Sequence, residues 1–224
     1  MPHILCKEML RTIVASILVV LIGWGAASRI TCDFQIWTEE GARRLQVALH
    51  PVDLPPVFIE GPNLTQTTLP ALLSQENSIT IASFIYTRCQ AVCLSLGSIF
   101  QQMQTVLLSN TGNAQIANVR LLSISFDREH DDLSALQTYA DNLSAQPELW
   151  HVVRVSQTEQ EQLLLRKLGV VVIPNGQGDY EHNAALLVFD SAGRMVRIFD
   201  IEEHQLALNY ALHLAGKHVA GTSS

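Results

Sequence analysis

Two cysteines, Cys89 and Cys93, lie where an apolar run of residues ends and a helical pattern begins. A spacing of four places both sulfurs on one helical face if the helix includes them. The amino terminus of a helix carries positive potential and Arg88 adds a positive charge, so the thiolate is favoured over the thiol. Accessible thiolates are either redox-active or ligands for a soft metal. The alternative is a pair of inert helix cysteines that pack like small hydrophobes.

The segments around these cysteines alternate between strand and helix patterns. Apolar runs typical of strands lie at 79–86, 119–126, 150–155, 184–189 and 195–199, and helical patterns lie at 93–108, 133–143, 157–168 and 204–214. A turn at residues 191–193 joins the last two strands into a hairpin. This alternation predicts an α/β sandwich with a mixed sheet. The cysteines then lie between the first of these strands and the first of these helices.

The composition excludes some classes of protein. The chain has 224 residues and a formal charge of −7, which argues against nucleic-acid binding, because phosphate contacts need clustered positive charge. Charged residues make up 16% of the chain, whereas a soluble domain averages about 25%. Together with 48% hydrophobic residues, this composition favours one soluble domain with a single membrane anchor.

Residues 12–28 contain no charged side chain and follow Lys7 and Arg11. These seventeen residues are at the short end for a membrane-spanning helix, and the flanking Arg11 and Arg29 can lengthen it by snorkelling. The positive amino-terminal stub favours export of the chain that follows. Small residues at 25–27 also fit a cleaved signal peptide, which is the alternative. We predict a single-pass anchor in a bacterial inner membrane, with the domain facing the periplasm.

Five of the eight prolines lie between Pro51 and Pro70, which is typical of an extended connection. The compact domain is therefore expected to begin near Pro56. The predicted organisation is a cytoplasmic stub at 1–11, a transmembrane anchor at 12–28, a stalk at 29–55, a globular domain at 56–218 and a flexible tail at 219–224.

Three segments carry a family resemblance. FIYTRCQAVC, at 84–93, resembles the cysteine motif of the Sco/SenC family of copper proteins. LLSISFDREHDD resembles the Ser-x-Asp-x-x-x-Asp segment of that family, here Ser125, Asp127 and Asp131. EHNAALLVFDSAGRMV resembles the stretch that holds the third copper ligand, which falls on His182. The three motifs occur in the family's order and spacing, over about residues 56–215.

The resemblance implies a thioredoxin-like three-layer sandwich in which Cys89, Cys93 and His182 hold copper, as Cu(I) or Cu(II). It also implies a metallochaperone that matures the copper centre of cytochrome c oxidase. Its expected partners are the oxidase subunit that carries this centre, other copper chaperones and thioredoxin-like reductases. The sequence departs from the family pattern at Gln90 and Leu94, which replace prolines, and at Glu181, which replaces an aspartate. Loss of the first proline favours a more mobile cysteine loop.

The chemistry of these ligands agrees with copper. Two thiolates and one imidazole form a soft site that suits Cu(I) and can take Cu(II), although Cys₂His also occurs in catalytic zinc sites. His182 follows a polar loop at 174–181, so it reaches the cysteines only if its strand neighbours theirs. We expect Arg88, Asp127 and Asp131 to surround the ligands without binding the metal. Asp132 is the preferred cap for the helix that begins at Leu133.

An exported thiol-disulfide reductase that uses Cys89 and Cys93 is the main alternative. The spacing Cys-x-x-x-Cys argues against it, because such enzymes use Cys-x-x-Cys. By resemblance, Ala184 also occupies the position where thioredoxins carry a cis-proline. A peroxidase fits less well, because Thr87 is two residues before Cys89 rather than three. The third class is an anchored protein that binds or senses copper without passing it on. The preferred hypothesis, a metallochaperone, does not require enzymatic activity.

Overall fold

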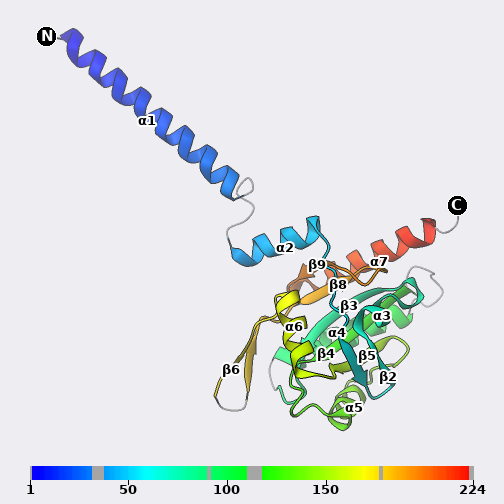
Figure 1. Ribbon diagram of the computed structural model, residues 1–224. Helices are drawn as coiled ribbons and strands as arrows, with labels where there is room; N and C mark the ends of the chain where they lie inside the picture. The colour runs from blue at the N-terminus through cyan, green and yellow to red at the C-terminus, as the bar shows by residue number, and fades with distance from the viewer. Residues whose placement is uncertain (1, 32–37, 90–91, 110–117, 177–178, 222–224) are drawn as a thin grey trace. The chain divides into compact units, whose positions relative to one another are not determined.

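The computed structural model describes residues 2–31, 38–89, 92–109, 118–176 and 179–221, without the side chains of residues 2–8, 76, 92–94 and 218–221. The chain divides into two compact units, Met1–Gln46 and Val47–Ser224 (Figure 1). The sheet and all of the candidate site residues belong to the second unit. Of the predicted tail at 219–224, residues 219–221 belong to the last helix and residues 222–224 lie outside the described residues.

The first unit contains a long apolar helix, α1 (Pro2–Ile30). Its segment Met9–Ile30 has 22 residues and is long and apolar enough to cross a membrane. This segment contains the predicted span at 12–28 and extends it at both ends, since Met9, Leu10 and Ile30 are also apolar. Its side chains are largely exposed in the described chain, as expected for a helix whose apolar surface requires a non-aqueous environment.

A second helix lies within residues 29–55, where the prolines predict an extended connection. α2 (Glu39–Leu49) begins after Thr38, whose hydroxyl accepts a hydrogen bond of 3.0 Å from the Gly41 N–H. The helix ends before Pro51, because proline cannot continue a helix. In this part of the chain the prolines therefore mark where a helix stops.

The second unit is built on a seven-stranded sheet with the order β2-β1-β5-β4-β3-β8-β9. The strands β3, β4 and β5 are parallel, and the other neighbouring pairs are antiparallel, so the prediction of a mixed sheet is confirmed. The strands are β1 (Phe58–Gly61), β2 (Leu64–Thr68), β3 (Ile79–Ile85), β4 (Val119–Ser125), β5 (Trp150–Val155), β8 (Leu186–Phe189) and β9 (Met195–Phe199). A separate antiparallel pair is formed by β6 (Val172–Pro174) and β7 (Tyr180–His182).

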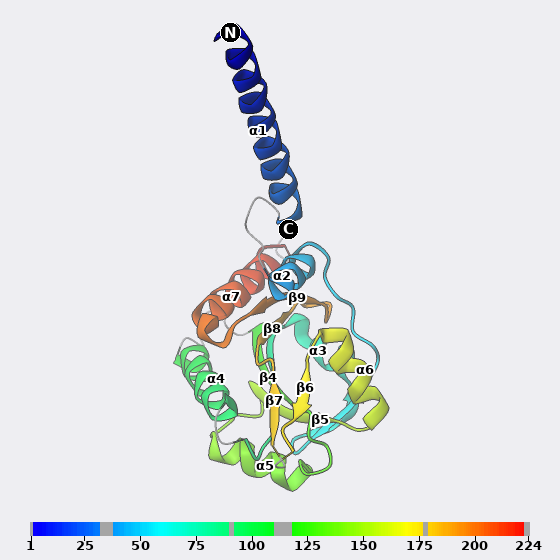
Figure 2. The same cartoon turned by 90° about the vertical axis from the view of Figure 1, so that its left-hand side faces the viewer.

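Helices cover both faces of the sheet. Figure 2 shows the sheet between α4 and α7 on one side and α3 and α6 on the other, which makes a three-layer sandwich. The helices of this unit are α3 (Leu69–Leu73), α4 (Val92–Ser109), α5 (Leu133–Asn142), α6 (Thr158–Leu168) and α7 (His204–Gly221), with 3₁₀ turns η1 (Gln75–Asn77) and η3 (Ile201–Glu203). The side chain of Asp132 accepts a 2.8 Å hydrogen bond from the Ala135 N–H, so its predicted role as the cap of α5 is confirmed.

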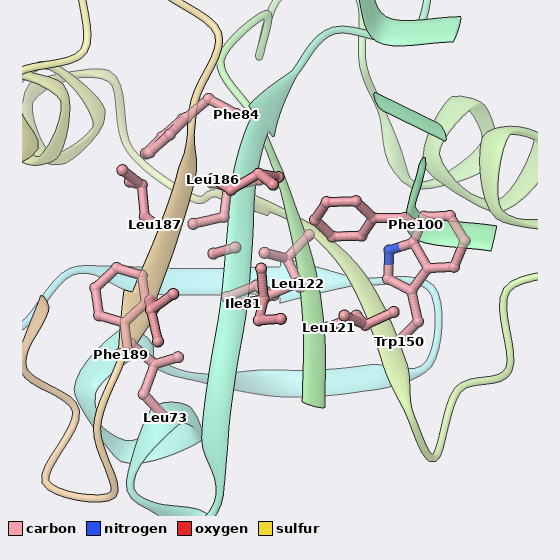
Figure 3. Close-up of a cluster of buried hydrophobic side chains, with 14 of the residues drawn as sticks. Leu73, Ile81, Phe84, Phe100, Leu121, Leu122, Trp150, Leu186, Leu187 and Phe189 are labelled. Atoms are coloured by element: carbon pink, nitrogen blue, oxygen red, sulfur yellow. The ribbon is translucent and has the colours of Figure 1, made fainter. Parts of the chain in front are cut away.

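The core lies between the sheet and its helices, where apolar side chains of β3, β4 and β8 gather (Figure 3). All seven residues of β3 are buried, as expected for a central strand that helices cover on both faces. The rings of Phe100 in α4 and Trp150 in β5 lie 5.4 Å apart. The Trp150 Nε1–H donates to Ser123 Oγ at 3.0 Å, so its one polar atom is satisfied inside the core.

The bounds predicted for the central strands and helices agree with the structure to within about two residues at most of their ends. Besides α2, the segments that the prediction missed are short or polar: the hairpin of β1 and β2, the helix α3 and the hairpin of β6 and β7. Their lengths of three to five residues are too short to show a clear periodicity. The last of these hairpins matters for function, because it contains His182.

The candidate site residues gather where the parallel strands end, which we call the carboxyl edge of the sheet. Ile85 pairs with Ser125 at the ends of the parallel strands β3 and β4, so both chains leave the sheet side by side. β8 runs antiparallel to β3 and therefore starts near this edge, where Ser83 Oγ donates to the Ala185 carbonyl at 3.0 Å. The segment before β8 contains β7. The neighbour relation that the sequence analysis required between the strand after His182 and the strand before the cysteines is thus confirmed.

Near this edge, α6 carries a buried carboxyl group. Glu161 is 8% exposed, and burial raises its pKa to about 7. A raised pKa means that the folded state holds the proton more tightly than the unfolded state, so stability is lost as the pH rises from about 4.5 to about 7. We expect Glu161→Gln, which stays neutral, to gain in melting temperature relative to the unchanged protein between pH 5 and pH 8. A difference in melting temperature that does not vary with pH would contradict this interpretation.

Candidate metal centre

The first part of the site is the cysteine turn, which we define as residues 86–89 after β3. The Cys89 N–H donates to the Tyr86 carbonyl at 3.3 Å, and Cys89 is 8% exposed. The described helix α4 begins at Val92, so it includes Cys93 but not Cys89. The prediction that one helical face carries both sulfurs therefore requires adjustment: Cys89 lies in the turn that leads to the helix. The side chain of Cys93 lies outside the described residues.

Asp131 fixes the backbone of the cysteine turn. Its Oδ2 atom accepts hydrogen bonds from the Thr87 N–H at 3.0 Å and from Ser125 Oγ at 2.5 Å, while Oδ1 accepts from Thr87 Oγ1 at 2.6 Å. Asp131 is fully buried, at 0% exposed. A buried carboxylate that accepts three hydrogen bonds is held firmly in place. Asp131 therefore fixes the position of Thr87, two residues before Cys89.

Asp127 is the second carboxylate beside the turn, and three side chains from different segments donate to it. Arg88 Nη2 donates to Oδ2 at 2.8 Å, whereas His130 Nδ1 and the Tyr180 hydroxyl donate to Oδ1 at 2.7 and 3.2 Å. Burial raises the pKa of Asp127, but the bonds from His130 and Arg88 outweigh burial and hold that pKa below its usual value. Asp127 therefore remains a carboxylate at neutral pH, as these donors require.

The second part of the site is the histidine hairpin, which we define as β6, β7 and residues 175, 176 and 179 between them. His182, at the end of β7, pairs with Val172 of β6. Its ring lies 5.0 Å from the Phe126 ring and 6.3 Å from the Tyr86 ring, measured between centroids. The Nδ1 atom of His182 is buried, and burial lowers the pKa of this histidine. The neutral imidazole, which is the form that binds metals, is thus favoured at neutral pH.

The structure brings most of the predicted site residues to one edge of the sheet. Arg88 and Asp127 form an ion pair, Asp131 bonds to Thr87 beside it, and the ring of His182 lies against that of Phe126, one residue before Asp127. Among the side chains that the structure describes, no three His, Cys, Asp or Glu residues gather as a metal site. The side chain of Cys93, one of the candidate ligands, is not among the described side chains. The candidate ligands are therefore judged by their chemistry: thiolate sulfur and neutral imidazole suit a soft metal.

Three aromatic residues of the site were not singled out by the sequence. Tyr86 and Phe126 read as the last residues of apolar strands, and Tyr180 reads as part of a polar loop. Their roles depend on which strands are neighbours. Only the pairing of β3 with both β4 and β8 brings these rings together, and no local spacing predicts it.

A cavity of about 290 Å³ lies at the opposite end of the sheet, at the starts of β3, β4 and β5, where Thr80, Arg120 and His151 contribute to its lining. Burial, and then the charge of Arg120, lower the pKa of His151. The cavity contains none of the candidate metal ligands, so we place the function at the edge that carries the cysteine turn.

The fold and site together define the class of protein: a thioredoxin-like domain with a Cys-x-x-x-Cys turn and a histidine hairpin at the carboxyl edge of its parallel strands. Residues 73–213, which are more than half of the chain, match the family model SCO1/SenC. The chain therefore belongs to the SCO1/SenC family.

Comparisons with individual proteins agree with this family. The SCO1 protein homolog of Bacillus subtilis (strain 168) is 24% identical over 132 residues, which span 58% of this chain and 66% of that relative. The structure of Arabidopsis thaliana ScoI with copper bound has a TM-score of 0.58 at 15% identity, and covers 71% of this chain and 97% of its own. BsSco is described as a member of the Sco family of cytochrome c oxidase assembly proteins that has a disulfide switch. Its TM-score is 0.61 at 18% identity, covering 75% of this chain and 95% of its own.

Proposed function

We propose that this protein is a copper metallochaperone, in which Cys89, Cys93 and His182 hold one copper ion as cargo. The observation that carries the proposal is the placement of the cysteine turn and the histidine hairpin at one edge of the sheet, with Arg88 and Tyr180 meeting on Asp127. Burial of Cys89 and of the His182 Nδ1 atom supports a dry, soft site. The copper-bound relative supports the choice of metal.

Three protein ligands leave a position open on copper, which allows transfer. An incoming ligand from a recipient can bind there before an old ligand leaves. The recipient that we propose is the cytochrome c oxidase subunit that carries a copper centre, because a relative is described as an assembly protein of that oxidase. Other copper chaperones or thioredoxin-like reductases would load the site or reduce its cysteines.

The protein is proposed to work at a bacterial inner membrane, anchored by α1 and with the second unit in the periplasm. The apolar segment Met9–Ile30 supports the anchor, and Lys7 near its amino-terminal end supports the orientation. A carboxyl-terminal fusion to alkaline phosphatase, which is active only after export, tests this directly. An inactive fusion that accumulates to normal levels would contradict the orientation.

The function is tested by anaerobic titration of the full chain in detergent micelles with Cu(I), against a colorimetric chelator that competes for copper. We expect one tightly bound copper per chain and a much weaker response to Zn(II) in a parallel titration, because thiolates and imidazole form a soft site. Copper-loaded protein mixed with the metal-free oxidase domain is expected to lose its copper to that domain. Tighter binding of zinc than of copper would overturn the proposal.

The same preparation separates the reductase alternative. If the protein binds no copper but reduces disulfides at a rate that His182→Ala leaves unchanged, then Cys89 and Cys93 act as a redox pair alone. The copper proposal requires the opposite pattern, in which the histidine matters for the function of the cysteines.

A further inference from the structure

Two tyrosine–aspartate hydrogen bonds join the histidine hairpin to the cysteine turn and to Asp127, which follows β4. The hydroxyl of Tyr86, in the cysteine turn, donates to Asp179 of the hairpin. The hydroxyl of Tyr180, in the hairpin, donates at 3.2 Å to Asp127, which also accepts from Arg88 of the cysteine turn. The cysteine turn therefore supplies one phenol to the hairpin, and the hairpin supplies one to Asp127, which Arg88 joins to the turn.

The rings of the two tyrosines also pack on each other. Their centroids lie 5.2 Å apart at 82°, and the ring of Tyr180 meets that of Phe126 edge-on at 5.5 Å. The same Phe126 ring contacts His182. Burial, and then the charge of Asp127, raise the pKa of Tyr180, so its hydroxyl keeps the proton that it donates. The geometry is thus an aromatic cluster with a hydrogen bond at each end.

The histidine hairpin needs such contacts, because its own structure is weak. Its strands have three residues each, and an isolated two-stranded hairpin is marginally stable in water. Ile173 is 55% exposed and Val171, just before β6, is 54% exposed, so these two side chains contribute little burial, whereas Val172 and Tyr180 pack against the core. The contacts of β7 with Tyr86 and Phe126 therefore help to set the position of the hairpin.

We infer that Tyr86 and Tyr180 are positioning residues, whose reciprocal bonds to Asp179 and Asp127 form a latch that holds His182 against the cysteine turn. This inference rests on the proposed function in one respect: the latch is useful to copper because His182 is a ligand. When the latch is open, the hairpin is free to leave the cysteine turn. The apparent affinity for copper then falls in proportion to the fraction of molecules in the latched state.

The test removes only the hydroxyl groups. Tyr86→Phe, Tyr180→Phe and the double variant keep the rings and their packing, and Tyr210→Phe is the matched control, since its ring packs on Phe199 of β9 rather than on the residues of the latch. Amide hydrogen exchange of residues 172–182 is measured in the metal-free full chain in detergent micelles. We expect about fivefold faster exchange in this segment for each hydroxyl removed, with the central strands and the control unchanged.

The Cu(I) affinity of the same variants supplies the second measurement. We expect it to fall by the factor by which the latched fraction, calculated from the exchange rates, falls, and the control to bind copper like the unchanged protein. Unchanged exchange in the double variant would overturn the latch. An affinity that stays unchanged although exchange shows that the latched fraction has fallen would show that the latch does not position His182, and would overturn its role. If the unchanged protein binds no copper, the proposed function fails, while the exchange result still decides whether the latch exists.

Discussion

Asp131→Ala is expected to destabilise the second unit by about 3 kcal/mol, because the buried donors of Thr87 and Ser125 lose a charged acceptor. For a domain of this size, such a loss lowers the melting temperature by roughly 6 to 12 °C. Since Asp131 holds the cysteine turn by the Thr87 backbone, the loss also loosens the position of Cys89. Thermal unfolding of the full chain in detergent, followed by circular dichroism, measures the effect.

The neighbouring aspartate is the matched control. Asp132 is exposed and caps α5 through one hydrogen bond, so Asp132→Ala is expected to cost about 1 kcal/mol. Asp131→Asn keeps the shape and one acceptor oxygen, and we expect its stability to lie between the unchanged protein and Asp131→Ala. The interpretation of Asp131 is wrong if its alanine variant is no less stable than that of Asp132.

The second large effect concerns the cargo. We expect the Cu(I) affinity to fall by more than about 100-fold in each of Cys89→Ser, Cys93→Ser and His182→Ala. Changing a residue that only supports a metal ligand already lowers metal affinity by about 10- to 100-fold. Serine replaces a soft sulfur with a hard oxygen at the same position, so the two cysteine variants test chemistry rather than shape. Competition with a colorimetric chelator under anaerobic conditions measures all three.

These variants must leave the fold intact for the comparison to count. His182 lies in the short histidine hairpin, outside the seven-stranded sheet, so His182→Ala is expected to change the melting temperature little. His213→Ala, on the exposed side of α7, is the matched histidine control and is expected to bind copper normally. Stoichiometric, tight copper in any one of the three variants removes that residue from the site.

The sequence predicts the central fold well, because buried elements impose a strong pattern. The largely apolar run of β3 marks a strand that is buried along its whole length. The pattern fails where few residues are buried. The hairpin of β6 and β7 is too short and too exposed to show a period, whereas α2 was missed because the prolines that follow it favoured an extended connection.

The candidate site divides in the same way. The cysteines and Arg88 are adjacent in sequence, so their chemistry can be read locally, and Asp132 follows from the rule for helix caps. His182 was identified as a candidate ligand through the family resemblance rather than from its spacing in the sequence. The roles of Tyr86 and Tyr180 depend on contacts between residues 93 and 53 positions apart, which exist only once β8 lies beside β3. Local sequence patterns contain no information on such pairing.

X-ray absorption at the copper edge tests the central claim most directly, because it reports the atoms bound to copper in the intact chain. For protein loaded with one equivalent of Cu(I), the account predicts two sulfur ligands and one imidazole nitrogen, and predicts that His182→Ala removes the nitrogen signal while the sulfur signal remains. A copper environment with sulfur ligands alone in the unchanged protein, or an imidazole signal that persists in His182→Ala, would contradict the assignment of Cys89, Cys93 and His182 as the copper site.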